Sequence, residues 1–432
     1  MNFKSFIATT AILVLFGCNP DSPTLPPATF ELAINNEYNE LNGRFAIFIT
    51  RPEDGSVLAF QWLPGEETSQ VQVPDSKETD LFDCTIVKVS TLIAPGTGVR
   101  DTFLNLTTYT QVSSGTQISL RDQVYQKATD LTFKLEGMNS LDSVVVPDAY
   151  AIQRPYPSNN YSAEYRCYHT GDIWLRILIN GDKFWKYVRF SNVTDDNLEA
   201  NTLDVNLLTS ILATPIRINF PFAAEWQYQA DGIVDTAKLQ FFPLSRQLLP
   251  PGSFIPDIAF TEIFEPVNNE QFEPNRPYSG FRLKTKGVGL GPDAYTYLSD
   301  NFYNTLPSDL PVPNFDLYPT VLSDNRLIAV DCAGEFDVLA FSRSRAGTLN
   351  INWEVLTKPS LGIVSYRLPD VPKTLGDLYL PLKTYDFGGV VRARAESYQK
   401  QLSFEDIIRN HLNASDVLWQ AKAGYLGREE TF

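Results

Sequence analysis

The stretch that decides the predicted fold class reads Ile173-Trp-Leu-Arg-Ile-Leu-Ile179, then Asn180-Gly181-Asp182, then Phe184-Trp-Lys-Tyr-Val-Arg-Phe190. Asn-Gly between two apolar runs favours a tight hairpin turn, because both residues tolerate positive φ. The flanking runs are rich in β-branched and aromatic residues, which are typical of strands. The sequence therefore predicts a β-hairpin over residues 173–190.

Similar signals recur on both sides of this hairpin. Phe45–Ile49 and Val57–Trp62 flank a turn that ends near Gly55, and Phe336–Phe341 and Thr348–Trp353 flank another turn. Short apolar runs separated by Pro, Gly, Asn and Asp are typical of an all-β protein. We therefore predict a mainly β fold with two or three β-sandwich-like domains in tandem.

One short helix is predicted near the C-terminus. Ser403-Phe-Glu-Asp406 can cap it, because the serine oxygen can accept a hydrogen bond from a free backbone amide of the first turn. Ile407, Ile408 and Leu412 give this helix an apolar face. A closing strand is predicted over Val417–Leu426. The glycines of Gly287–Gly291 lack phosphate-loop spacing and predict a flexible loop.

The length of the chain predicts more than one domain, because about 400 residues exceed one ordinary hydrophobic core. The run from Pro243 to Pro256 contains four prolines and marks the clearest boundary. We predict β-sandwich-like domains over 29–142 and 143–256, followed by a loop-rich β domain over 257–432 that contains the C-terminal helix.

The N-terminal residues of the chain predict where in the cell the protein is located. Lys4 precedes an apolar run from Phe6 to Phe16 that is too short to span a bilayer, and Leu15-Phe16-Gly17-Cys18 closes it. This leader resembles the signal peptides of the bacterial lipoprotein class. The resemblance implies that residues 1–17 are removed, that Cys18 carries a lipid, and that the protein is exported and anchored in the cell envelope. We expect the outer membrane of a Gram-negative bacterium.

The segment 18–28 is predicted to be a lipidated, proline-rich tether, because four of the ten residues after Cys18 are proline. Proline fixes φ and lacks an amide donor, so such a run stays extended outside a core. The lipid on Cys18 is therefore the predicted contact with the membrane.

The charge of the chain argues against a nucleic acid partner. Removal of the leader takes away Lys4 and no acidic residue, which leaves 34 basic against 51 acidic residues and a net charge of −17. Phosphate backbones repel such a protein. The expected partner is instead an envelope protein or a glycan.

The remaining cysteines are Cys84, Cys167 and Cys332. An exported protein can form disulfides, but three thiols allow at most one intrachain pair. Their long spacings do not indicate which two, if any, would pair, and buried free thiols are the alternative.

Candidate ligand-binding residues are few. Trp174 and Trp185 lie on the two strands of the central hairpin and are candidates for stacking on a glycan, although buried tryptophans more often fill a core. Asp195, Asp196 and Glu199 are weak calcium candidates, because carboxylates bind calcium but the loop pattern of known calcium sites is absent. No clustered His or Cys ligands occur, so no metal site and no cofactor are predicted.

No catalytic residue stands out, since the chain lacks a GxSxG nucleophile motif and a zinc-binding HExxH motif. The favoured interpretation is a non-enzymatic, lipid-anchored envelope protein that binds a partner protein or a glycan. A secreted hydrolase of the glycosidase kind, using two carboxylates, is the first alternative. A structural subunit of an envelope assembly is the second.

Overall fold

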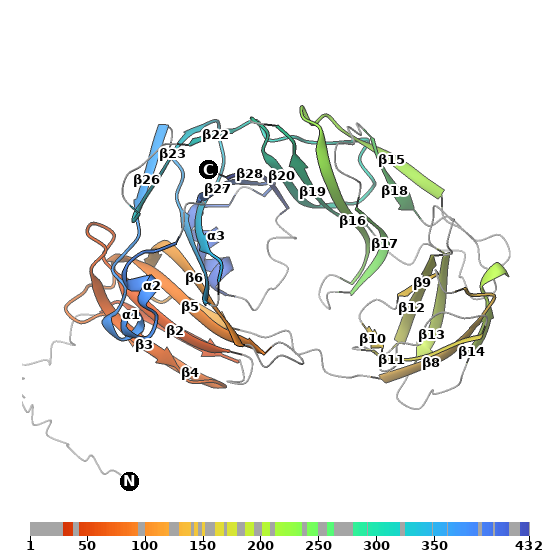
Figure 1. Cartoon of the computed structure of the whole chain (residues 1–432), viewed down its shortest axis with the longest axis horizontal. Helices are drawn as coiled ribbons and strands as arrows, with labels where there is room; N and C mark the ends of the chain where they lie inside the picture. The colour runs from red at the N-terminus through yellow and green to blue at the C-terminus, as the bar shows by residue number, and fades with distance from the viewer. Residues whose placement is uncertain are drawn as a thin grey trace, which may run out of the picture.

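The computed structural model of the chain is mostly β, which confirms the predicted fold class (Figure 1). It describes residues 29–37, 43–93, 100–120, 129–139, 142–145, 149–151, 160–167, 171–178, 186–193, 201–207, 212–235, 240–248, 257–262, 280–291, 293–319, 325–347, 349–360, 362–387, 391–400, 402–413 and 424–431.

Twelve strands form one continuous sheet that arches across the molecule (Figure 1). All neighbouring strands pair antiparallel except β25 and β6, which run parallel. The sheet takes strands from all three predicted segments and so crosses residues 142 and 256; those boundaries stay predictions. In sheet order the strands are β17 Gln240–Leu248, β16 Ala224–Asp235, β19 Phe281–Gly289, β20 Thr296–Tyr303, β28 Tyr425–Thr431, β27 Val391–Tyr398, β24 Val338–Arg345, β25 Leu349–Thr357, β6 Arg100–Ser113, β5 Leu81–Ile93, β2 Arg44–Thr50 and β3 Val57–Leu63.

Five smaller sheets accompany the large one. The first is β4 Glu67–Gln72, β1 Glu31–Asn36 and β7 Gln117–Leu120, and the second is β22 Asp316–Pro319, β23 Leu327–Ala333 and β26 Gly362–Arg367. The third is β18 Asp257–Glu262, β15 Leu212–Ile218 and β21 Asp309–Leu310. The remaining two are β10 Ala149–Ala151, β11 Asn160–Cys167, β8 Thr129–Glu136 and β14 Asn201–Asp204, and β13 Lys186–Val193, β12 Gly171–Leu178 and β9 Ser143–Val145.

The three predicted hairpins form paired strands. β2 pairs with β3, β24 with β25, and β12 with β13, each antiparallel. In the last pair, Trp174 lies opposite Arg189 and Ile177 opposite Lys186. The turn itself, which contains Asn180-Gly181, lies outside the described residues. Local turn and strand signals therefore identified these pairs correctly.

The predicted C-terminal helix is α3, Phe404–Leu412. The Ser403 side chain accepts a hydrogen bond from the Asp406 amide, as expected for a cap. Two short helices were not predicted, α1 Lys373–Leu378 and α2 Leu380–Lys383, and a 3₁₀ turn covers Val205–Leu207. Of the predicted closing strand Val417–Leu426, residues up to 423 lie outside the described residues, and β28 covers Tyr425–Thr431.

Strand β2 shows how the layers are built. Phe45, Ile47 and Ile49 join one hydrophobic cluster, while Ala46 and Phe48 on the opposite face join another. A continuous apolar run of this kind is typical of a strand that is buried on both faces. The N-terminal part of the large sheet is therefore the middle of three layers.

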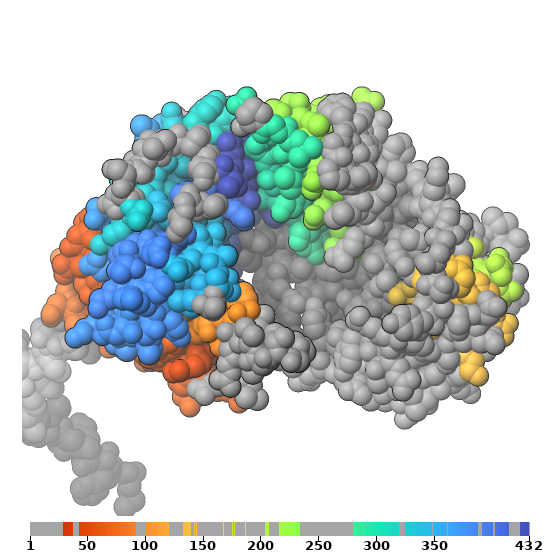
Figure 2. Space-filling view, in the orientation of Figure 1, coloured from red at the N-terminus to blue at the C-terminus, as the bar shows by residue number. Residues whose placement is uncertain are grey.

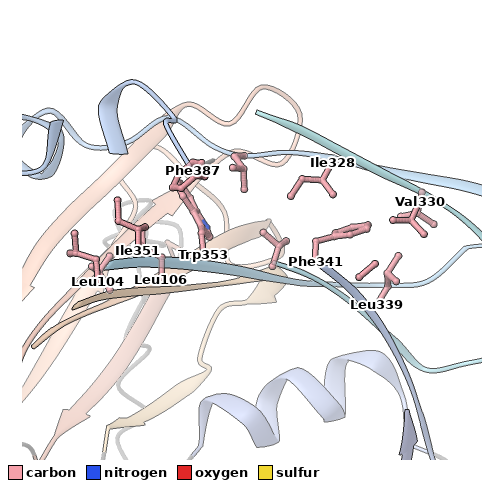
Figure 3. Close-up of a cluster of buried hydrophobic side chains, with 14 of the residues drawn as sticks. Leu104, Leu106, Ile328, Val330, Leu339, Phe341, Ile351, Trp353 and Phe387 are labelled. Atoms are coloured by element: carbon pink, nitrogen blue, oxygen red, sulfur yellow. The ribbon is translucent and has the colours of Figure 1, made fainter. Parts of the chain in front are cut away.

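The first of these clusters packs under α3 and the sheet β4-β1-β7. The second packs under the sheet β22-β23-β26 and helices α1 and α2. Figure 3 shows this second core, with Trp353 beside Phe387 and with Ile328 and Val330 closing over Phe341 and Leu339. Trp353 also donates a hydrogen bond from its indole nitrogen to the Thr108 hydroxyl at 2.9 Å.

The prediction of a flexible loop at Gly287–Gly291 is wrong for Gly287–Gly289, which belong to strand β19. Gly287 lies opposite Trp226 of β16, and an added Cβ would come within 2.5–2.8 Å of the indole ring. The glycine is needed to make room for a buried aromatic side chain, rather than to make a loop flexible.

Candidate functional site

A third hydrophobic cluster covers one face of β16, β19 and β20, and contains Trp226, Leu283 and Tyr297. The opposite face of these strands carries polar residues in register. Gln227 lies opposite Lys286, and Gln229 opposite Lys284. We call this the polar face and include in it the matching side of β28, β27 and β25. Figure 2 shows a hollow beneath the arch of the sheet.

The exposed side chains of the polar face include cations and amides. They are Gln227, Lys284, Lys286, Asn352 and Arg392. Along each strand these exposed residues alternate with buried ones. In β19 the buried residues are Leu283, which belongs to the third cluster, Thr285 and Gly287. A strand with one dry and one wet face gives this alternation.

Acidic residues of the polar face are held by arginines. Arg394 donates from Nε to Glu396 Oε1 at 2.6 Å and from Nη2 to Glu354 Oε1 at 3.0 Å. A carboxylate oxygen of Glu429 lies 4.0 Å from Arg394 Nη1. The Tyr398 hydroxyl donates to the second oxygen of Glu396 at 2.7 Å. Strands β25, β27 and β28 thus meet in one ion cluster.

A second ion pair lies two strands away. Arg282 binds Asp300 through two hydrogen bonds, from Nε at 2.9 Å and from Nη2 at 2.8 Å. Tyr425 of β28 lies opposite both Asp300 of β20 and Tyr398 of β27. Strand β28 therefore connects the two ion clusters, as well as the two halves of the sheet.

The electrostatics of the Arg394 cluster resemble an acid–base pair at first sight. Burial raises the pKa of Glu354, whereas Arg394 brings the pKa of Glu396 below its ordinary value despite its burial. Opposite shifts in two neighbouring carboxylates are typical of glycosidases. Here, however, both carboxylates bind the same arginine and Glu396 is 3% exposed. The arrangement is that of a buried ion network.

His411 packs beside this network. Burial lowers its pKa to about 4, Glu396 acts against this shift, and Arg394 adds to it. Its ring lies 6.3 Å from that of Tyr109. The imidazole is therefore neutral at pH 7.

The structure does not describe the side chains of the two tryptophans predicted to bind a glycan. Strand β12 contains Trp174, but its side chain and the whole of Trp185 lie outside the described residues. Of the other tryptophans, Trp226 and Trp353 are 1% and 0% exposed and fill cores, while Trp62 is half-buried. Glycan binding by Trp174 and Trp185 stays a prediction.

The weak calcium candidates Asp195, Asp196 and Glu199 lie outside the described residues, as does Cys18. Within the described ranges, no group of three His, Cys, Asp or Glu side chains is placed to hold a metal ion.

Cys84, Cys167 and Cys332 are buried and carry free thiols. Burial raises the pKa of Cys84 above its ordinary value and that of Cys332 to about 11. The thiols of Cys84 and Cys332 are therefore protonated at neutral pH and unreactive, because the thiolate is the nucleophile.

Sequence reasoning missed the Arg394 cluster. A local signal was present, because Val391-Arg-Ala-Arg-Ala-Glu-Ser-Tyr398 alternates long polar and small residues, as expected for a strand with one polar face. The partners Glu354 and Glu429 lie tens of residues away along the chain. Only the strand order brings them together.

Comparisons with known proteins add little. No protein-family model matches the chain, and no curated protein matches it. Among solved structures, the chain is similar to the tip fimbrial protein Mfa3 from Porphyromonas gingivalis with C-terminal truncation. The identity is 10%, the match covers 63% of this chain and 81% of that chain, and the TM-score is 0.12. A TM-score this low does not indicate a shared fold.

No helix in the described part of the chain is long and apolar enough to cross a membrane.

Proposed function

We propose that this chain is a lipid-anchored protein of the cell envelope that binds a partner protein or a glycan through the polar face. The leader carries the first half of the proposal, because Leu15-Phe16-Gly17-Cys18 closes a basic and then apolar segment, as in bacterial lipoproteins. The proline-rich segment 18–28 would hold the β body away from the bilayer. The proposed site of anchoring is the outer membrane of a Gram-negative bacterium.

The polar face carries the second half. This sheet face presents the cations Lys284, Lys286 and Arg392 to solvent. Glu354, Glu396 and Asp300, which could neutralise these cations, are already bound to arginines. In a chain with a net charge of −16, local positive charge favours a partner with acidic groups.

Anchoring is tested by Cys18→Ala in the native cell, followed by separation of membranes from the soluble fraction. The wild-type chain and a Ser22→Ala control should be recovered with membranes. Cys18→Ala should lose membrane recovery at least tenfold, because it removes the acceptor of the lipid. Equal membrane recovery of the Cys18→Ala variant would contradict the anchor.

Partner binding is tested by reversing charge on the polar face. The double variant Lys284→Glu/Lys286→Glu is compared with Lys77→Glu/Lys358→Glu, which changes the same charge at exposed positions elsewhere. Affinity capture from native membranes should recover one stoichiometric partner with the wild-type chain and with the control. Charge reversal at Lys284 and Lys286 should reduce this recovery at least tenfold, and unchanged recovery would contradict the assigned face.

A further inference from the structure

The junction of helices α1 and α2 exposes apolar side chains to solvent. Leu378 is 60% exposed and Leu380 is 65% exposed, while Tyr379 between them packs its ring against the second hydrophobic cluster. We call Leu378-Tyr379-Leu380 the apolar tip. Because Tyr379 packs against the core, the backbone that carries the two leucines is anchored to the folded body.

Aromatic and basic residues surround the apolar tip. Arg44 of β2 lies 4.7 Å from the ring centre of Trp62 on edge strand β3. The pKa of Tyr379 is raised by burial, and the guanidinium of the same arginine partly opposes this shift. Lys373 and Lys383, which are exposed, belong to α1 and α2, and Lys383 pairs with Asp377 at 3.0 Å.

This combination fits the interface of a bilayer. Exposed leucines gain by leaving water, tryptophan and tyrosine favour the headgroup level, and lysine and arginine keep their charges at the lipid headgroups. Basic side chains are also attracted to anionic lipids. A protein partner would be expected to bury such leucines in a larger apolar patch, yet the residues beside them are charged.

The start of the described residues and the apolar tip belong to the two outer layers of the same three-layered part of the molecule. The Phe30 amide donates a hydrogen bond to the Ser76 hydroxyl at 3.0 Å. A cleft of about 320 Å³ is lined by both Ser76 and Arg51, so the start of the body lies beside the β2–β3 turn. In that turn the Gly55 carbonyl accepts from the Asp370 amide at 2.9 Å, shortly before α1 (Figure 1).

The reach of the tether matches this placement. Eleven residues from Cys18 to Ala28 span at most about 40 Å when fully extended. A lipid on Cys18 therefore keeps the start of the body within about 40 Å of the bilayer, and the apolar tip belongs to that same part of the molecule.

From these observations we infer that Leu378 and Leu380 insert into the same membrane that holds the lipid of Cys18. This inference rests on the proposed anchoring. The bilayer is then the binding partner of the apolar tip. The protein has two membrane contacts, one through the lipid of Cys18 and one through the folded chain. The polar face, on another part of the molecule, is then left open to a partner.

The test places a spin label on the full-length lipidated protein in vesicles of phosphatidylethanolamine and phosphatidylglycerol. Leu380→Cys is compared with Ile363→Cys, a matched control because Ile363 is 66% exposed on β26, away from the tip. The native thiols at 84, 167 and 332 are buried and will not compete. The spin label at 380 should be more accessible to collision with oxygen than with a water-soluble nickel complex. The spin label at 363 should show the reverse.

If the spin label at 380 is more accessible to the nickel complex than to oxygen in protein that carries its lipid, the inference is overturned. Spin–spin broadening at 380 would overturn it as well, because it would mean that a second copy covers the tip.

A second measurement separates this inference from the proposed anchoring. The mature chain without its lipid is floated with the same vesicles. Leu378→Ser/Leu380→Ser should lower the bound fraction at least fivefold, while Ile363→Ser should leave it unchanged. If mass spectrometry finds no lipid on Cys18 but flotation depends on the two leucines, the anchor proposal fails and the apolar tip stands. If the double-serine variant floats as well as the wild-type chain, the inference about the apolar tip fails, whatever the state of Cys18.

Discussion

Two parts of the same sheet face differ sharply in composition. Under α3 and the sheet β4-β1-β7 the face is apolar, with Ile47, Ile49 and Val338 fully buried. A few strands away, where none of the described elements forms such a layer, the face presents Lys284 and Lys286. The change of composition follows the edge of the covering layer. The bare part therefore suits contact with water or a polar partner, and is not an uncovered hydrophobic surface.

The border between the two parts is where the charges are buried. Arg394 and Glu396 lie on β27, next to the apolar side chains that pack under α3. There a charged pair gains strength from a low dielectric but depends on complete pairing. The predictions below test the covered part, the border and the bare part in turn.

The largest effect is expected at the border. Arg394→Ala should lower the free energy of unfolding by about 3–5 kcal/mol, because it leaves Glu396 buried without its cation. Arg392→Ala on the same strand should change it by no more than about 0.5 kcal/mol, since Arg392 is exposed. Urea denaturation measures both values. Equal effects would show that the two arginines share one environment.

Within the covered part, Ile47→Ala should cost about 2–5 kcal/mol, because it opens a cavity in a fully buried cluster. Lys286→Ala, on the bare part of the face, should cost no more than about 0.5 kcal/mol. Thermal unfolding of the two variants checks this difference. A large loss from Lys286→Ala would mean that something in the fold covers the bare part.

The pH dependence of stability should report His411. Its folded pKa of about 4 lies below the ordinary histidine pKa of 6.5, so the unfolded chain binds more protons between these values. Stability should therefore fall as pH drops from about 6.5 to about 4, by at most about 3 kcal/mol. Burial raises the pKa of Asp83 from 3.8 to about 6, which adds stability as pH falls through that range and opposes His411.

Replacement separates the two groups. The stability of His411→Gln relative to the wild-type chain should improve as pH falls from about 6.5 to about 4. The stability of Asp83→Asn relative to the wild-type chain should worsen between about pH 6 and about pH 4. Denaturation curves at several pH values measure both trends. Parallel pH profiles of wild type and His411→Gln would show that His411 titrates normally.

The smallest effect is expected on the dry side opposite the bare part. Gly287→Ala should cost about 1–3 kcal/mol, because its Cβ would press on the buried Trp226 ring. Adding Trp226→Leu should make the glycine substitution nearly neutral, a coupling that a double-mutant cycle measures. Additive effects would contradict the packing of the indole on Gly287.

Much of the local structure was predictable from the sequence. The three hairpins follow from turn residues between apolar runs, and α3 follows from the Ser403 cap and its apolar face. These signals act over a few residues, so they can be read without knowing the fold. The alternation in β27 was visible as well, although its meaning as a polar face was missed.

The joining of these pieces into one sheet was not predictable. Strand β6 pairs in parallel with β25, and Leu104 lies opposite Ile351, although no turn connects them. Strand β28 inserts between β20 and β27 from the far end of the chain. Such pairings depend on the shape of whole surfaces. The ion cluster of Glu354, Arg394 and Glu429 exists only once they have formed.

The most direct test is amine footprinting of Lys284 and Lys286 in native membranes and in purified protein, with exposed Lys77 as the reference. If the polar face binds a partner, both lysines should be modified readily in purified protein and protected at least fivefold in membranes, while Lys77 reacts equally in both. Equal modification of Lys284 and Lys286 in the two preparations would contradict the assignment of this face to a partner.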